Sequence, residues 1–236
     1  MIIGIMDFVC IIAAILPAVV LLMYVYKKDK VEKEPLGLLG GLLVQGCIAV
    51  VISLVLETVG ERVLLNIFDP DTHWYWVAFA FLVVAAVEEG SKFVLLKRKT
   101  WNNPNFNFRF DGIVYAVFVS LGFAALENIG YVMGYGLSVA PTRALISVPG
   151  HMAFAVYMGY YYGRARWLAN YGYQEEAKSS LRYSILSAIF YHGFFDACLM
   201  IGSSLTTTIF LIFVVITYVR VFLTVKNESK TDAPII

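Results

Sequence analysis

Charged side chains are scarce in this chain. They make up 15% of its 236 residues, whereas a soluble globular domain carries about 25%. Hydrophobic residues make up 60%. The composition therefore excludes an ordinary soluble domain and indicates a membrane protein whose surroundings are a lipid bilayer.

Cysteine is rare, at three residues, and each of them lies inside an apolar stretch. Cys10, Cys47 and Cys198 match neither a disulfide framework nor a metal motif, and we interpret them as small packing residues. The chain also lacks a serine in a nucleophile-elbow setting and a cysteine beside a histidine. Catalysis by a side-chain nucleophile is therefore not favoured.

Long apolar runs are what the sequence has in abundance. A helical run must cover about 30 Å of hydrocarbon at about 1.5 Å per residue. We place seven such spans at about 4–26, 36–57, 75–97, 111–134, 143–164, 182–201 and 203–225. The runs are too continuous for barrel strands, so the predicted fold is all-α, a polytopic transmembrane helix bundle of about seven spans. The first run has no positive segment before it, and we expect a span rather than a signal peptide.

The orientation of these spans follows from the basic residues between them. The second and fourth connections hold one each, Arg62 and Arg143, and the sixth holds none. The first, third and fifth connections hold the rest: Lys27, Lys28, Lys30 and Lys33; Lys97, Arg98, Lys99 and Arg109; Arg164, Arg166, Lys178 and Arg182. By the positive-inside rule, the N-terminus lies outside and the C-terminus inside. Because topology accounts for the basic residues, no nucleic-acid partner is expected.

One membrane domain fills most of the chain. We expect a single transmembrane helical domain over residues 1–226, with its core helices at about 75–201, and a cytoplasmic tail at 227–236. The connection at 166–180 has the composition of a short surface helix. Glycine pairs at four-residue spacing are typical of closely packed helices in a bundle. They are Gly37 and Gly41, Gly130 and Gly134, and Gly159 and Gly163.

The third span carries two adjacent glutamates, Glu88 and Glu89, in its apolar middle. An ionised side chain at the bilayer midplane costs roughly 2.5–3.5 kcal/mol, so such a pair needs partners or water. Lys92 follows Glu88 at i+4 and shares its helical face, while Glu89 lies about 100° around the axis. These residues predict a polar site inside the bundle.

Three other spans supply candidate partners: Glu127 with its neighbour Asn128, then His151, then His192 with Asp196 at i+4. Pro149-Gly150 precedes His151 and should disturb the helix there. At the rise of an α-helix, Glu127, His151 and His192 lie roughly 10–14 Å below the outer ends of their spans, and Glu88 about 15–20 Å. Ionisable groups on four helices thus share one layer in the outer half of the membrane.

Carboxylates and imidazoles at one depth suit the activation of water. A glutamate can act as general base with a histidine beside it. Alternatively, a zinc site can form from Glu127, His151 and His192, with Glu88 as a further candidate ligand or as the base. Asp196 would then orient His192 or a neighbour. The residues leave both alternatives open.

The order of these motifs resembles that of the PrsW family of intramembrane proteases, distant relatives of the CAAX-processing type II endopeptidases. Four motifs carry the resemblance on successive spans: Glu88-Glu89-x-x-Lys92, Phe123-x-x-x-Glu127, His151 and His192-x-x-x-Asp196. The CAAX enzymes carry EExxxR and FxxxH, so the carboxylate of Glu127 stands where they have an imidazole.

The resemblance implies a multi-pass protein of the bacterial plasma membrane. Members of the family make the first, site-1 cut in a membrane-anchored anti-sigma factor with one transmembrane span, near the extracytoplasmic side, and the sigma factor is later released in a stress response. Our first hypothesis is therefore an intramembrane peptidase. Its catalytic residues are Glu88, Glu89, Glu127, His151 and His192, and its supporting residues are Lys92, Asn128 and Asp196.

Two other classes of function use the same polar layer. A proton- or ion-coupled transporter also needs intramembrane Glu, His and Asp chains, although no pair of interrupted segments is found in two halves of the chain. A scaffold would bind the span of a partner through its small-residue faces. Hydrolysis of a peptide bond distinguishes the peptidase from both.

Overall fold

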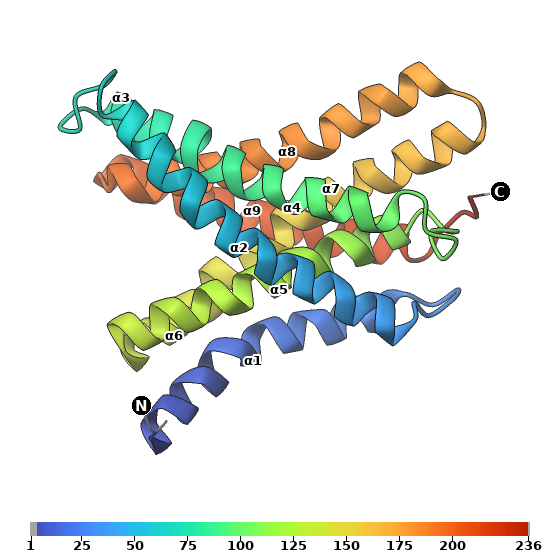
Figure 1. The fold of residues 1–236 in the computed structure, drawn as a ribbon, viewed down its shortest axis with the longest axis horizontal. Helices are drawn as coiled ribbons and strands as arrows, with labels where there is room; N and C mark the ends of the chain where they lie inside the picture. The colour runs from blue at the N-terminus through green and yellow to red at the C-terminus, as the bar shows by residue number, and fades with distance from the viewer. Residues whose placement is uncertain (1–3, 236) are drawn as a thin grey trace.

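The computed structural model describes residues 4–235, and within them the regular secondary structure is helical, with one isolated bridge between Phe108 and Pro234. The α-helices are α1 (Ile5–Lys28), α2 (Leu36–Leu64), α3 (His73–Ala78), α4 (Ala86–Thr100), α5 (Asp111–Tyr135), α6 (Ala140–Thr142), α7 (Val148–Asn170), α8 (Gln174–Ile201) and α9 (Ser204–Glu228) (Figure 1). Two π-helical segments, η1 (Phe79–Ala85) and η3 (Arg143–Ser147), precede α4 and α7, and a 3₁₀ turn, η2 (Leu137–Val139), precedes α6.

Five of these helices are long and apolar enough to cross a membrane: α1, α2, α5, α8 and α9. The prediction of an all-helical membrane protein is thereby confirmed. The predicted spans at 75–97 and 143–164 lie in helical segments that a π segment divides, α3–η1–α4 and α6–η3–α7. Both segments also carry charged or polar residues of the candidate site, which lower their hydropathy.

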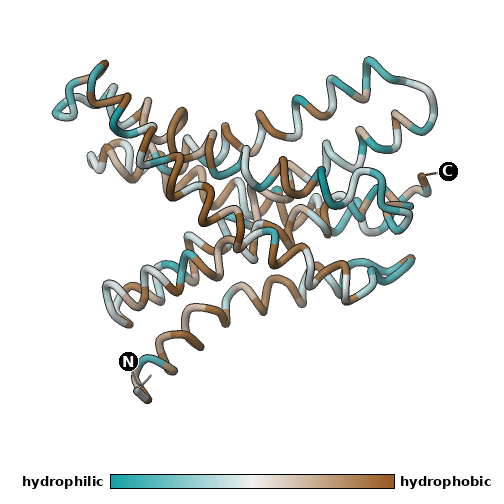
Figure 2. The backbone as a smooth tube through the Cα atoms, viewed as in Figure 1, coloured by the Kyte–Doolittle hydropathy of each residue, from teal (hydrophilic) through white to brown (hydrophobic). Residues whose placement is uncertain are grey.

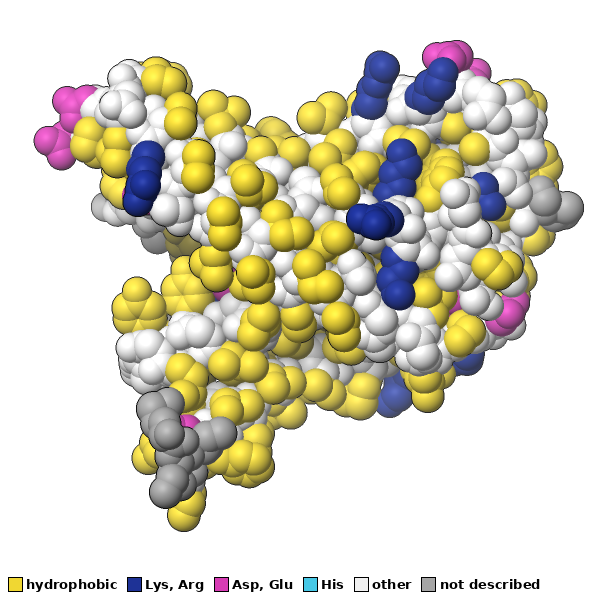
Figure 3. Space-filling view, in the orientation of Figure 1, with side chains coloured by type: hydrophobic (Ala, Val, Ile, Leu, Met, Phe, Trp, Pro, Cys, Tyr) yellow, Lys and Arg dark blue, Asp and Glu magenta, His cyan; other side chains and the backbone are white. Residues whose placement is uncertain are grey.

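The helices form two arms that diverge toward one end of the molecule. In Figure 1, α1 and α6 lie in the lower arm and α2 and α3 in the upper arm, on the left of the view. Figure 3 shows a hollow between the arms, and most lysines and arginines on this face lie at the opposite end. Hydrophobic residues follow the lengths of the helices, and hydrophilic ones gather at the turns (Figure 2).

Helix α5 lies at the centre of the bundle. Every residue from Asp111 to Ala124 is buried, as expected for a helix that is apolar on all sides. A Cβ at Gly159 of α7 would lie 2.5 Å from the carbonyl oxygen of Gly112 in α5. The backbones of the two helices therefore touch at this glycine, and α7 carries His151 on the same packed face.

Only one of the three predicted glycine pairs lies where the backbones of two helices touch. The pair Gly159 and Gly163 is confirmed as a close contact between helices, because a Cβ at either position would collide with backbone of α5 or the segment before it. Gly37, Gly130 and Gly134 have no atom within 4 Å of such a Cβ, so the packing prediction is wrong for them. An unpredicted contact joins Gly46 of α2 to the backbone of α5 near Gly122.

In two places the helices extend beyond the predicted boundaries. The segment 166–180 is not a short surface helix, because α7 continues to Asn170 and α8 begins at Gln174 after a turn with Gly172 at φ +86°. Helix α2 continues to Leu64, seven residues beyond the predicted end of its span at 57. Because α2 is longer than predicted, Glu57 lies within the helix rather than at its end.

The C-terminal tail is attached to the loop before α5. The backbone N–H of Arg109 donates to the carbonyl of Ala233 over 3.0 Å, and that of Phe110 donates to Asp232 Oδ1 over 2.9 Å. Ser229 Oγ donates to the carbonyl of Lys28 at the end of α1. The last residues thus join the ends of α1 and α5 at the basic end of the bundle.

Two carboxyl groups outside the spans are buried at this end, Asp29 and Glu34. Burial raises the pKa of Asp29 to about 6, against the opposing charge of Lys33. Burial also raises the pKa of Glu34 to about 7, while the hydroxyl of Tyr115, which donates to Glu34 over 2.6 Å, acts in the opposite direction. Asp29 Oδ2 has no hydrogen-bond partner among residues 4–235.

Gly159→Ala should destabilise the bundle because its methyl group forces α5 and α7 apart. Overpacking of this kind costs about 1–3 kcal/mol, which is roughly 2–4 °C in Tm per kcal/mol for a chain of this length. Gly130→Ala is the matched control, since open space surrounds that position and alanine favours a helix. Thermal unfolding in detergent measures both, and an equal Tm for the two variants would contradict the close α5–α7 contact.

Asp29→Asn should stabilise the protein at pH 7.5 but not at pH 4. Because burial raises the folded pKa to about 6, the unfolded carboxyl ionises first as the pH rises. Stability therefore falls between about pH 4 and pH 6 in the wild type, and asparagine removes that loss. We expect a gain on the order of 1 kcal/mol, about 2–4 °C in Tm. The exposed Asp71→Asn serves as control, and a gain independent of pH would contradict the assignment.

Candidate functional site

A cavity of about 440 Å³ lies where the two arms meet, within the range of about 300–1,000 Å³ that ligand pockets have. It receives side chains from α2, α4, α5, α7 and α8. Apolar walls come from residues such as Val50, Leu54, Phe79, Phe123 and Phe195. The polar lining consists of Ser53, Glu57, Glu88, Glu127, Tyr131, Arg143, Ser147, His151, His192 and Asp196.

The glutamate pair of α4 is held by a buried lysine. Lys92 Nζ lies 3.0 Å from Glu88 Oε2 and 2.7 Å from Glu89 Oε1. Glu88 is 5% exposed, Glu89 0% and Lys92 1%. The long side chain of Lys92 reaches both carboxylates, although they point in different directions around the helix. Glu88 faces the cavity, whereas Glu89 lies behind it, toward α8.

His192 of α8 connects Glu89 to Asp196. Its Nδ1 lies 3.0 Å from Glu89 Oε1, and its Nε2 lies 3.2 Å from Asp196 Oδ2. The ring of Phe154 stacks on the imidazole at a centroid distance of 4.8 Å. With both nitrogens engaged and one face covered, the imidazole has a fixed orientation.

His151 of α7 connects Lys92 to Glu127 of α5. Its Nδ1 lies 3.4 Å from Lys92 Nζ, and its Nε2 lies 3.2 Å from Glu127 Oε2. Ser120 Oγ donates to the carbonyl of His151 over 2.9 Å, which attaches this turn of α7 to α5. The irregular stretch lies just before Pro149-Gly150, because the π segment η3 ends at Ser147 and both residues belong to the first turn of α7.

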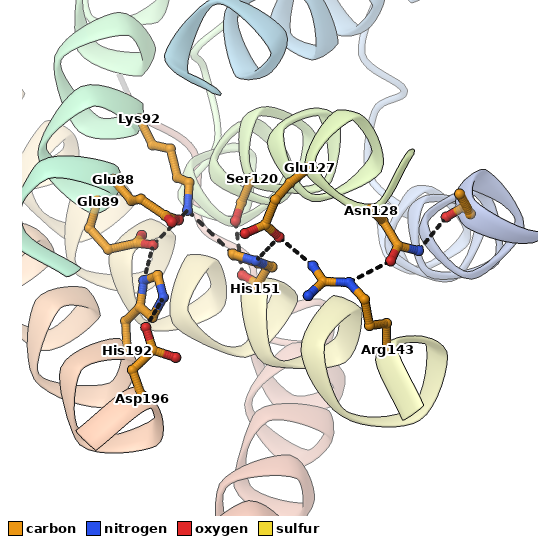
Figure 4. Close-up of polar contacts among 11 residues, drawn as sticks. Glu88, Glu89, Lys92, Ser120, Glu127, Asn128, Arg143, His151, His192 and Asp196 are labelled. Carbon is orange, nitrogen blue, oxygen red and sulfur yellow. Dashed lines mark hydrogen bonds and ion pairs between the residues drawn. The ribbon is translucent and has the colours of Figure 1, made fainter. Parts of the chain in front are cut away.

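The structure brings all the predicted site residues into one connected network (Figure 4). It runs from Asp196 through His192, Glu89, Lys92 and His151 to Glu127, and Glu88 joins it at Lys92. Asn128 joins it through a residue that sequence reasoning missed. Four helices thus meet in one polar layer, as their common depth predicts.

The missed residue is Arg143. Its Nη2 donates to Glu127 Oε2 over 2.6 Å and its Nε to Asn128 Oδ1 over 2.6 Å, while the guanidinium lies 3.8 Å from the ring centroid of Tyr131. Asn128 Nδ2 in turn donates to the carbonyl of Ala14 in α1 over 2.7 Å. One sequence feature could have pointed to Arg143: it is the single basic residue of the fourth predicted connection. The sequence places it in a loop, but the π segment η3 directs it to the site.

Glu57 of α2 is the second residue that sequence reasoning missed. It lines the same cavity, and its Oε1 is buried without a hydrogen-bond partner among residues 4–235. Its sequence signal is weak, because a carboxylate at the end of a predicted span is expected to reach water. The longer α2 seen here removes that explanation.

Three residues of the network could hold a metal ion. Glu88, Glu89 and His151 each offer one ligand atom, and the three atoms lie within 4.8 Å of one another. The ammonium of Lys92 contacts all three side chains, so a metal ion bound by them would have to displace it. Glu89 Oε2 is buried without a partner among the described residues. Carboxylate oxygens and an imidazole nitrogen are donors that zinc accepts, so the residues fit a metal.

The residues whose ligand atoms lie close together only partly match the predicted ligand set of Glu127, His151, His192 and Glu88. Glu88 and His151 belong to the group of close ligand atoms, and Glu89 joins them. Glu127 and His192 contact this group through hydrogen bonds to His151 and Glu89. They are therefore placed to orient ligands.

The chain is similar to known proteins over most of its length. Residues 34–224 match the PrsW family intramembrane metalloproteases. Curated proteins named Protease PrsW are similar over most of their length: that of Clostridioides difficile is 32% identical, covering 86% of this chain and 84% of the relative. The Geobacillus kaustophilus protein is 34% identical (80% and 78%), and that of Bacillus subtilis 33% (80% and 82%). No solved structure matches the chain. The chain therefore belongs to the PrsW family of intramembrane metalloproteases, and it is a multi-pass membrane protein.

Proposed function

We propose that this protease makes the site-1 cut in a membrane-anchored anti-sigma factor with a single transmembrane span. The observation that carries the proposal is the convergence of two glutamates and two histidines, from four separate helices, on one cavity. Family membership favours the peptidase over the transporter and the scaffold, which share the same polar layer.

We further propose seven spans with the N-terminus outside, in a bacterial plasma membrane. The five apolar helices and the two divided helical segments support this count. The basic residues on the face in Figure 3 lie mostly at the end away from the hollow. With that end in the cytoplasm, the hollow opens toward the extracytoplasmic side, where the site-1 cut is expected.

Hydrolysis needs a base for the attacking water. Glu88 and Glu127 are the two glutamates of the network that face the cavity. In the proposed reaction, the water oxygen bonds to the carbonyl carbon while a facing glutamate accepts the proton. The C–N bond then breaks, and the same proton passes to the leaving amine. Lys92 and His151 hold the two carboxylates in place for this transfer.

Negative charge develops on the carbonyl oxygen as water attacks. Arg143 lines the cavity and commits two of its nitrogens to Glu127 and Asn128. A guanidinium has five N–H donors, so others remain for the developing oxyanion. Donors of this kind are worth most where water is excluded.

We propose zinc as the metal, held by Glu88, Glu89 and His151. A divalent ion would polarise the scissile carbonyl and lower the pKa of a bound water. With Glu88 engaged as a ligand, Glu127 is the facing glutamate left to accept the proton. His192 and Asp196 then orient Glu89.

Glu88→Gln and His192→Ala should abolish cleavage of a single-span anti-sigma reporter reconstituted with the purified protein. We expect losses of about 100-fold to 10,000-fold, because Glu88 is either the base or a metal ligand and His192 orients Glu89. Arg143→Gln should lower kcat by about 10-fold to 100-fold with a smaller change in KM. The exposed Glu61→Gln is the control for folding and for surface charge. Full activity in both Glu88→Gln and His192→Ala would sink the proposal.

The purified protein should contain about one zinc per chain by elemental analysis. The metal should be lost in Glu89→Gln and His151→Ala, since each removes one of the three close ligands. Chelation should stop cleavage, and added zinc should restore it. Active protein purified without chelator and free of metal would instead assign water activation to the glutamate–histidine network alone.

A further inference from the structure

Glu57 is a carboxylate that lines the cavity and has no role in the proposed reaction. It lies on α2, on the arm opposite α1, and lines the same cavity as Glu88 and Glu127. Its side chain is close enough to interact electrostatically with both of them. Its Oε1 is buried and has no hydrogen-bond donor among residues 4–235. A buried carboxylate oxygen without a donor points to a partner that arrives with a ligand.

The other carboxylates of the site already have partners. Glu88 and Glu89 contact Lys92, Glu127 contacts Arg143, and Asp196 contacts His192. Glu57 forms no ion pair within the described part of the chain. It is also absent from the group of close metal-ligand atoms. Neither the network nor the metal site therefore explains it.

The charge of the site indicates what kind of partner is missing. Five carboxylates, including Glu57, meet two permanent cations, Lys92 and Arg143. Both cations contact other carboxylates, and Glu57 has no cationic partner in an ion pair among residues 4–235. A positively charged group on the substrate would supply one.

The residues that line the cavity beside Glu57 indicate the chemistry of the rest of that partner. Val50, Ser53 and Leu54 precede it by seven, four and three residues, so they share its helical face and line the same cavity. Phe79 adds a further apolar surface. A lysine or arginine side chain combines an apolar stem with a charged end, which matches this lining.

We propose that Glu57 is a specificity-determining residue, which binds a lysine or arginine side chain of the substrate near the scissile bond. This assignment rests on the proposed peptidase function and adds the substrate feature that the cavity selects. Because Glu57 and the catalytic residues line one cavity, the basic residue should stand at a fixed distance from the cut bond.

The test uses the full-length protein in liposomes with a set of single-span reporters. Each reporter carries one Arg, Gln or Glu, moved residue by residue through the outer half of its span, and mass spectrometry locates every cut. The measured quantity is the ratio of kcat/KM for the Arg reporter to that for the Gln reporter at each position. A ratio taken within one preparation does not depend on the fraction of active enzyme.

For the wild type, we expect a ratio of about tenfold or more at one position relative to the cut, which corresponds to about 1.4 kcal/mol. Glu57→Gln should bring the ratio close to one, and Glu57→Asp should keep it well above one. Glu57→Lys should prefer the Glu reporter at that position. Glu61→Gln, four residues along α2 and exposed, should keep the wild-type ratio.

Three outcomes would overturn the inference. A wild-type ratio near one at every position would remove the basic-residue preference but leave the peptidase proposal intact. An unchanged ratio in Glu57→Gln would assign the preference to another residue. Absence of any cut that Glu88→Gln abolishes would defeat the peptidase proposal and the inference with it.

Discussion

The ammonium of Lys92 is the interaction on which the site depends. It is 1% exposed and lies between two carboxylates on its own helix and an imidazole from another. In surroundings of low polarity, removing one member of such a cluster leaves an uncompensated charge that costs several kcal/mol. The cluster is therefore satisfied only when α4 and α7 are both in position, and Glu89 extends it to His192 of α8. Assembly of the bundle and assembly of the site are the same event.

Backbone contacts at glycine provide the geometry that this cluster needs. Gly159 lets α7 touch α5, and Gly46 lets α2 touch it near Gly122. These contacts lie toward the basic end of the bundle, where α5 is buried on all sides. Past Ala124 the same helix is partly exposed, and the arms separate. The polar layer thus lies at the boundary between a packed region, which fixes its helices, and a hollow, which admits a ligand.

Much of this arrangement could be predicted from the sequence. The apolar runs gave the helices, and a common depth for Glu88, Glu127, His151 and His192 gave one polar layer. Arg143 and Glu57 were not predicted as site residues, because their positions depend on where helices end and on a π segment. Hydropathy alone specifies neither. The close pair Gly46 and Gly122 escaped for another reason. Contact between two distant helices is a property of the packed bundle, whereas the spacing rule reads one helix at a time.

The attachment of the tail has a consequence for biosynthesis. Ser229 bonds to the carbonyl of Lys28, which is 201 residues earlier in the chain, and Asp232 and Ala233 bond to the segment before α5. These contacts have high sequence separation, and such contacts form late because a long loop must close first. Lys28 leaves the ribosome 201 residues before Ser229. This end of the bundle can therefore close only after residues 229–233 are made, so a nascent chain that already holds α1 and α5 still lacks this closure.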